Sequence, residues 1–81
     1  MNPLQKVIDF LERLREANLV FRLDSVREAV MVVVMIPDEH WEVEFFPDGH
    51  VEVEVYRSDS TDAGLEDESS LERLFAETAE E

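Results

Sequence analysis

The clearest structural signal in this sequence is the stretch from Ala29 to Tyr56. It opens with an unbroken apolar run at 29–36, and two segments in which apolar and acidic residues alternate follow at 41–46 and 51–56. Strict alternation is the period of a half-buried strand, and β-branched and aromatic residues favour the same structure. A Pro-Asp pair lies in each of the two gaps. We therefore expect three consecutive antiparallel strands joined by short turns.

The N-terminal segment has the pattern of a helix. Asn2 is a suitable cap, Pro3 suits the first helical position, and Gln5 can reach back to the amide of the cap. The helix should end near Ala17, with Asn18 in the left-handed conformation. Its expected apolar stripe consists of Leu4, Val7, Ile8, Leu11 and Leu14.

The remaining segments complete an α+β fold. Residues 19–24 fit a short first strand, and residues 57–64 read as a polar loop without periodicity. Asp67 or Ser69 caps a last helix. The expected buried edge of that helix consists of Leu71, Leu74, Phe75 and Thr78. The prediction is a single α+β domain over 1–81, a four-stranded antiparallel meander with an N-terminal and a C-terminal helix packed on one face (α-β-β-β-β-α).

Length and composition predict the number of domains, the stability and the cellular compartment of the protein. A chain of 81 residues makes one domain, and it buries only about 60–65% of the surface that its unfolded form exposes. It has no cysteine, its first residues lack the apolar core of a secretory signal, and the run at 29–36 is too short for a membrane helix. We therefore expect a soluble, cytoplasmic protein of modest stability.

The formal charge of −14 is confined to one half of the chain. Up to Pro37, five acidic residues balance five basic ones, whereas from Asp38 onward sixteen acidic residues face only Arg57 and Arg73. Such a field repels nucleic acid and anionic lipid and attracts basic proteins. We expect no nucleic-acid and no membrane partner.

The two alternating strands should place their acidic residues on one outer face. A turn at Asp48-Gly49 sets Phe46 opposite His50, and the pairing of the other residues follows from it. The pairs expected on this face are His40 with Tyr56, Glu42 with Glu54, Glu44 with Glu52, and Phe46 with His50. Like charges directly opposite each other destabilise a sheet by up to about 1 kcal/mol per pair. Water and salt can screen them, a basic partner can neutralise them, or a divalent metal or a proton can sit among them with His40 or His50 as ligand.

No constellation in the sequence points to catalysis. Carboxylates spread over flat strands do not converge on one point, and no calcium-loop spacing is present. A pair of acid–base carboxylates would also need a concave pocket. We expect no catalytic residue, no metal site and no cofactor, and hence a protein that is not an enzyme.

The apolar strand at 29–36 has a second face to cover. With a two- or four-residue turn at Pro37, the inward residues are Val30, Val32, Val34 and Ile36, together with Trp41. Met31, Val33 and Met35 then lie outside, next to Glu44, Glu42 and His40, whereas a three-residue turn reverses the assignment. With either turn length, apolar side chains of this strand remain on the outer face. Exposed apolar surface of this kind is typical of an interface.

Three phrases carry a resemblance to known proteins: Arg22-Leu23-Asp24, Trp41-Glu42-Val43-Glu44-Phe45-Phe46-Pro47-Asp48-Gly49 and Arg57-Ser58-Asp59. In these phrases the chain resembles a group of short acidic bacterial α-β4-α proteins, largely uncharacterised, that are similar to immunity proteins of toxin systems. The resemblance implies an inhibitor-type role and carries over no catalytic residue.

Two functions are therefore expected. The first is a non-enzymatic interaction module that neutralises a basic partner, such as a nuclease toxin, through its sheet face. The alternative is a small structural homodimer that pairs through the outer sheet face or an edge strand, with Arg22, Arg27 or Arg57 approaching the glutamates. The expected contact residues are Met31, Val33, Met35, His40, Glu42, Glu44, Phe46, Glu52, Glu54 and Tyr56.

Overall fold

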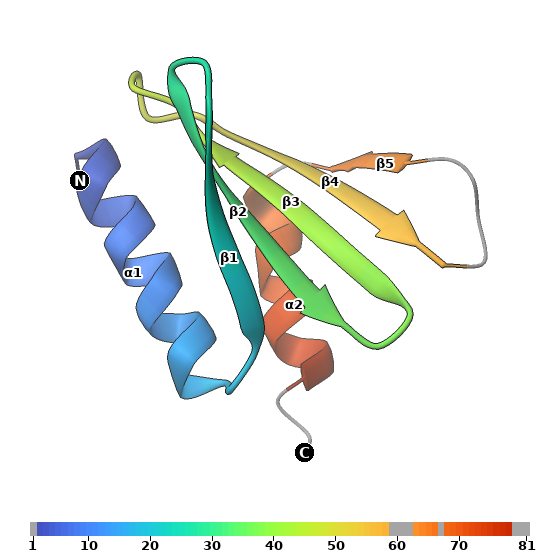
Figure 1. Cartoon of the computed structure of the whole chain (residues 1–81). Coiled ribbons are helices and arrows are strands. Elements are labelled where there is room, and N and C mark those ends of the chain that lie inside the picture. Colours follow the sequence, from blue (N-terminus) through green and yellow to red (C-terminus); the bar gives the residue numbers. More distant parts are fainter. Residues whose placement is uncertain (1, 59–62, 67, 79–81) are drawn as a thin grey trace.

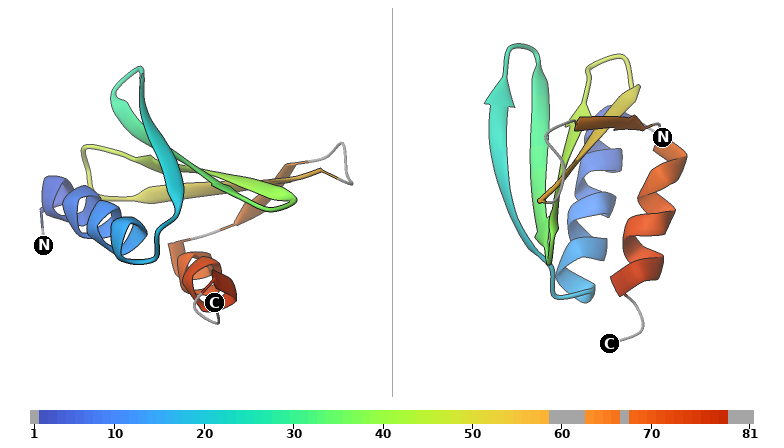
Figure 2. Two further views of the ribbon diagram at one scale, coloured as in Figure 1. Left: turned by 60° about the horizontal axis from the view of Figure 1, so that its bottom comes forward. Right: turned by 90° about the vertical axis from the view of Figure 1, so that its right-hand side faces the viewer.

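In the part of the chain that the structure describes, five strands form one antiparallel sheet, and two α-helices lie on the same face of it (Figures 1 and 2). The computed structural model describes residues 2–58, 63–66 and 68–78. In chain order the elements are α1 (Pro3–Glu16), β1 (Val20–Val26), β2 (Ala29–Ile36), β3 (Glu39–Phe45), β4 (Val51–Arg57), β5 (Ala63–Glu66), the 3-10 helix η1 (Glu68–Ser70) and α2 (Leu71–Thr78). Neighbouring strands in the sheet follow the chain order from β1 to β5. The predicted helix, four-stranded meander and final helix are confirmed.

Strand β5 was not predicted. Ala63 and Gly64, assigned from the sequence to a polar loop, pair with Tyr56 and Val55 of β4. A strand of four residues is too short to show a reliable alternation of polar and apolar residues. It forms against the otherwise open edge of β4, so its formation depends on a neighbour that is not local in sequence.

Helix α1 begins and ends as predicted. The backbone N–H of Gln5 donates to Asn2 Oδ1 at 2.7 Å, and Asn18 has a φ of 60°. The side chain of Gln5 does not reach back to the cap, since its Nε2 donates to Asp9 Oδ1 at 2.9 Å. The side chain of Asn2 therefore caps the helix without a reciprocal hydrogen bond from Gln5.

The buried face of α1 is rotated relative to the predicted stripe. It consists of Val7, Phe10, Leu11 and Leu14. Phe10, which was not predicted, packs its ring 5.5 Å from that of Phe45 and 5.8 Å from that of Phe75. Leu4 and Ile8, which were predicted to be buried, are 68% and 41% exposed. The rotation places α1 so that it contacts α2 as well as the sheet.

Helix α2 covers the other part of the same face. Leu71 and Leu74 are buried and Phe75 packs against the core, as predicted. Glu72 turns toward α1, where its two oxygens accept from the guanidinium of Arg13 at 3.0 and 3.2 Å. The predicted cap at Asp67 and the side chain of Thr78 lie outside the described residues.

The β1–β2 hairpin rises away from the helix layer, as Figure 2 shows. Leu23, on the face of β1 that looks toward the helices, is 52% exposed for this reason. Farther along the sheet, Val32, Val34, Trp41, Val43, Val53 and Val55 are almost completely buried under the two helices. No helix in the described part of the chain is long and apolar enough to cross a membrane.

Candidate interaction face

The turn between β2 and β3 decides which residues point outward. Ile36 pairs with Glu39, so the turn has two residues, and Asp38 takes a left-handed φ of 69°. With this turn, the odd-numbered residues of β2 lie on the outer face, away from the helices. The outer face of β2 therefore meets that of β3 at Met31 with Glu44, Val33 with Glu42, and Met35 with His40.

Four glutamates form two rows across β3 and β4. Glu42 lies directly opposite Glu54, and Glu44 lies directly opposite Glu52, in the predicted register. We call these four residues the glutamate ladder. Because β3 and β4 are antiparallel and the two rows are adjacent on one face, four carboxylates share a small area of surface.

The first end of the ladder is closed by Phe46 and His50. Their rings stack with centroids 4.2 Å apart, and the backbone N–H of Phe46 donates to the carbonyl of His50 at 3.1 Å. His50 Nδ1 lies 2.6 Å from Asp48 Oδ1, and its Nε2 lies 3.4 Å from Glu52. The hydrogen bond to Asp48 raises the pKa of His50, and the charges of Asp48 and Glu52 act in the same direction.

The second end is closed by a similar pair. The rings of His40 and Tyr56 stack with centroids 4.6 Å apart, and His40 Nε2 lies 3.6 Å from Glu42. The Tyr56 hydroxyl donates to Glu54 at 3.4 Å. Partial burial raises the pKa of the Tyr56 phenol, and the nearby carboxylates of Glu42 and Glu54 raise it further. The phenol thus stays neutral and remains a donor.

In the described part of the chain, few side chains contact the ladder carboxylates. In residues 2–58, 63–66 and 68–78, no lysine or arginine forms an ion pair with any of these four carboxylates. The same described residues contain no group of three or more His, Asp or Glu side chains that could hold a metal ion. Three of the four carboxylates instead contact imidazole or phenol groups: Glu42 contacts His40, Glu52 contacts His50 and Glu54 contacts Tyr56.

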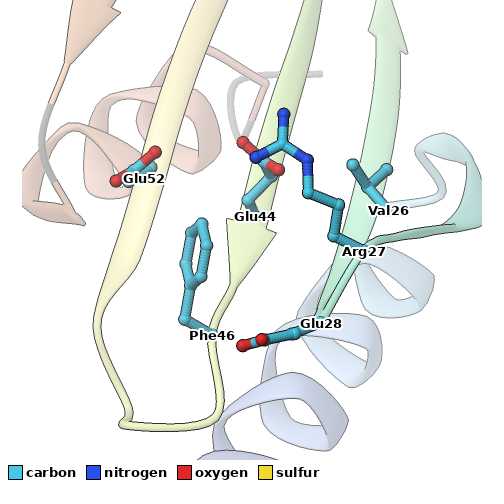
Figure 3. A pocket seen from close by; sticks show the side chains of 6 residues that line it. All are labelled: Val26, Arg27, Glu28, Glu44, Phe46 and Glu52. Atoms are coloured by element: carbon cyan, nitrogen blue, oxygen red, sulfur yellow. The ribbon is translucent and has the colours of Figure 1, made fainter.

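A hollow of about 400 Å³ lies at the Phe46 end of the ladder. It is lined by Val26, Arg27, Glu28, Glu44, Phe46 and Glu52 (Figure 3). Arg27 comes from the β1–β2 turn, where its φ is 53°, and its side chain extends across the hollow toward Glu44 (Figure 3). Sequence reasoning did not find this hollow, because it arises only where the raised hairpin faces β3 and β4.

The apolar part of the predicted contact surface is smaller than expected. Met35 is 43% exposed and Met31 is half-buried, but Val33 is only 2% exposed. Val33 lies between Arg22 of β1 and Glu42 of β3, whose longer side chains flank it. Val33 is therefore removed from the candidate contact residues, and the other nine predicted residues share the outer face.

The chain matches no family model, no curated protein and no solved structure in the comparisons made with them. The chemistry of the face follows from its geometry: carboxylates in two rows accept hydrogen bonds from cationic groups, and flat rings at both ends offer stacking surfaces.

Proposed function

We propose that this protein is a non-enzymatic interaction module that binds a basic protein through the outer face of β3 and β4, as an immunity or inhibitor protein binds its target. A nuclease toxin is one partner of this chemistry, because a nucleic-acid site is itself rich in lysine and arginine. The lack of cysteine suits a reducing compartment, and we place the protein in the cytoplasm.

The observation that carries the proposal is the juxtaposition of Glu42 with Glu54 and of Glu44 with Glu52. Each pair of opposed carboxylates costs the isolated fold up to about 1 kcal/mol. A partner that inserts guanidinium or ammonium groups between the rows removes this repulsion and gains charge-assisted hydrogen bonds. The repulsion that weakens the free protein thus adds to its affinity for a cation-bearing surface.

The surroundings of the ladder favour a protein partner over a free ion. The hollow beside Phe46 is lined by Glu44 and Glu52 as well as by the phenyl ring. A long cationic side chain of a partner that enters it in place of Arg27 can meet the ring and both carboxylates. Arginine suits such a place because its guanidinium stacks on rings and donates to carboxylates at the same time. Met35 adds exposed apolar area on the adjoining strand.

The test compares capture of proteins from a lysate of the cells that produce this chain. One bait is the wild type, and a second carries Glu42→Gln and Glu44→Gln, which keep the shape of the ladder and halve its charge. A third bait carries Glu12→Gln and Glu16→Gln on α1, which change the net charge equally but lie outside the face. Capture is measured at about 0.05 M and about 0.5 M salt, because screening weakens exposed charge pairs.

The expected result is a basic protein that the wild type and the α1 variant retain at low salt and that the ladder variant loses. Retention should fall at high salt for both binding baits. Capture that is equal for all three baits, or capture only of acidic proteins, would contradict the proposed function.

A further inference from the structure

Strand β1 is a free edge of the sheet. Among the described residues it pairs only with β2, on one side, and it is seven residues long. It exposes large apolar side chains, with Val20 at 69% and Leu23 at 52%. Natural proteins commonly protect such an edge with charges or prolines, or cover it with another chain.

The geometry of the β1–β2 hairpin shows which backbone groups face outward. Val26 pairs with Ala29 across a two-residue turn, and such a closing pair exchanges both of its hydrogen bonds. Because such pairs alternate along an antiparallel ladder, the intervening residues direct their N–H and C=O groups away from β2. These residues are Phe21, Leu23 and Ser25. They present a row of unpaired donors and acceptors at the edge.

The side chains of β1 are complementary to a second copy of the same strand. In a two-fold antiparallel pairing centred on Leu23, the strand meets itself with Leu23 opposite the partner's Leu23. Arg22 then lies opposite the partner's Asp24, and Val20 lies opposite the partner's Val26. Within one chain, Arg22 Nε already lies 3.4 Å from Asp24 Oδ2 on the outer face, so both charges are positioned on the side where they would meet.

The rest of this edge also suits a second copy. The chain up to Pro37 has no net charge, so two copies can approach here without the repulsion that β3 and β4 would cause. Lys6 and Arg13 face η1 and α2, where they pair with Glu68 and Glu72. At 100° per residue, Leu4 and Ile8 lie on the opposite flank of α1, the flank from which Arg15 reaches Phe21 of β1. Exposed apolar area therefore adjoins the edge.

We propose that two copies of this chain associate through their β1 edges, in the register centred on Leu23, to form one continuous ten-stranded sheet. Isologous two-fold pairing is the commonest way for a protein to associate with itself. The outer faces of β3 and β4 remain free in this dimer, so the dimer presents two glutamate ladders. The proposal does not depend on the proposed binding of a basic partner.

The test uses charge exchange at the paired positions. Arg22→Asp makes both positions of the edge acidic, and Asp24→Arg makes both basic, so each single variant opposes like charges in the proposed register. The double variant R22D/D24R restores opposite charges. Sedimentation equilibrium up to about 1 mM protein gives the dimer dissociation constant of each, and this range covers the weak affinity of a small interface. We expect each single variant to dimerise at least about tenfold more weakly than the wild type and the double variant to recover.

An equimolar mixture of the two single variants gives the sharpest result. One protomer is then acidic and the other basic at both positions, so they should form a heterodimer although neither forms a homodimer. Glu16→Arg on the exposed side of α1 changes the net charge as Asp24→Arg does and should leave the dissociation constant unchanged. A wild type that stays at the 9.4 kDa monomer mass throughout, or single variants that dimerise as the wild type does, would overturn the proposal.

Discussion

The indole Nε1–H of Trp41 donates to Glu39 Oε1 at 2.9 Å, while Arg57 Nε lies 2.8 Å from Glu39 Oε2. The side chain of Trp41 is fully buried at the centre of the core, and that of Glu39 is only 13% exposed. One carboxylate therefore satisfies the polar atom of the largest core residue and joins the first residue of β3 to the last of β4. The acidic residue at this position therefore has a structural role.

Glu39→Ala should lower the free energy of unfolding by about 1–3 kcal/mol, because it leaves the buried indole N–H without an acceptor. Glu39→Gln should cost less, since its amide oxygen can still accept from Trp41. Urea unfolding followed by the fluorescence of Trp41 measures both values. Equal losses for the two variants would mean that the ion pair with Arg57, and not the indole hydrogen bond, is the main contribution.

Glu54→Gln should stabilise the isolated protein by a few tenths to about 1 kcal/mol at low salt, because it removes the repulsion from Glu42 and keeps an acceptor for the Tyr56 hydroxyl. The gain should shrink as salt is added. Thermal melts at two salt concentrations measure it, with Glu16→Gln on α1 as the control. A variant less stable than the wild type would show that Glu54 makes a favourable contact that outweighs the repulsion.

His50 should make stability depend on pH in a defined direction. Asp48 raises the pKa of His50 above its ordinary value of 6.5, so the folded state holds this proton more tightly than the unfolded chain does. The contribution is complete below pH 6.5 and is lost as pH rises through the raised pKa. The free energy of unfolding should therefore increase as pH falls from about 8 to about 6. Urea titrations at several pH values measure this slope.

His50→Gln should flatten that dependence, and Asp48→Asn should reduce it, because the hydrogen bond to Asp48 is the main cause of the raised pKa. If His50→Gln leaves the slope between pH 8 and pH 6 unchanged, another group is responsible for it.

Arg13→Ala should destabilise the packing of α1 against α2. The guanidinium of Arg13 binds both oxygens of Glu72 and lies 4.0 Å from the centre of the Phe75 ring. Because Glu72 is largely exposed, most of the effect should come from the ring contact, and we expect a loss of about 0.5–1 kcal/mol. Glu72→Gln should cost less than Arg13→Ala. Urea unfolding of both variants gives the comparison, and the reverse order would assign the main contribution to the ion pair.

The sequence leaves the register of β2 against β3 open, because that register depends on the length of the turn at Pro37. The register of β3 against β4, and with it the pairing of the four glutamates, could be predicted. These features follow from a period of two and from short turns, which act between neighbours in the chain. The N-cap at Asn2 and the left-handed residue Asn18 also depend only on neighbours in the chain, and both were predicted from the sequence.

Other features depend on contacts between elements that are distant in the chain. The exposure of Leu23 and the reach of Arg27 toward Glu44 follow from the rise of the β1–β2 hairpin off the helix layer. Val33 is buried because the longer side chains of its neighbours Arg22 and Glu42 flank it. Strand β5 formed because the edge of β4 was open, and Phe10 replaced Leu4 and Ile8 in the core because α1 packs against α2 as well as the sheet. The twist of the sheet and the positions of the helices result from many weak contacts between residues that are distant in the chain. No local pattern in the sequence predicts them.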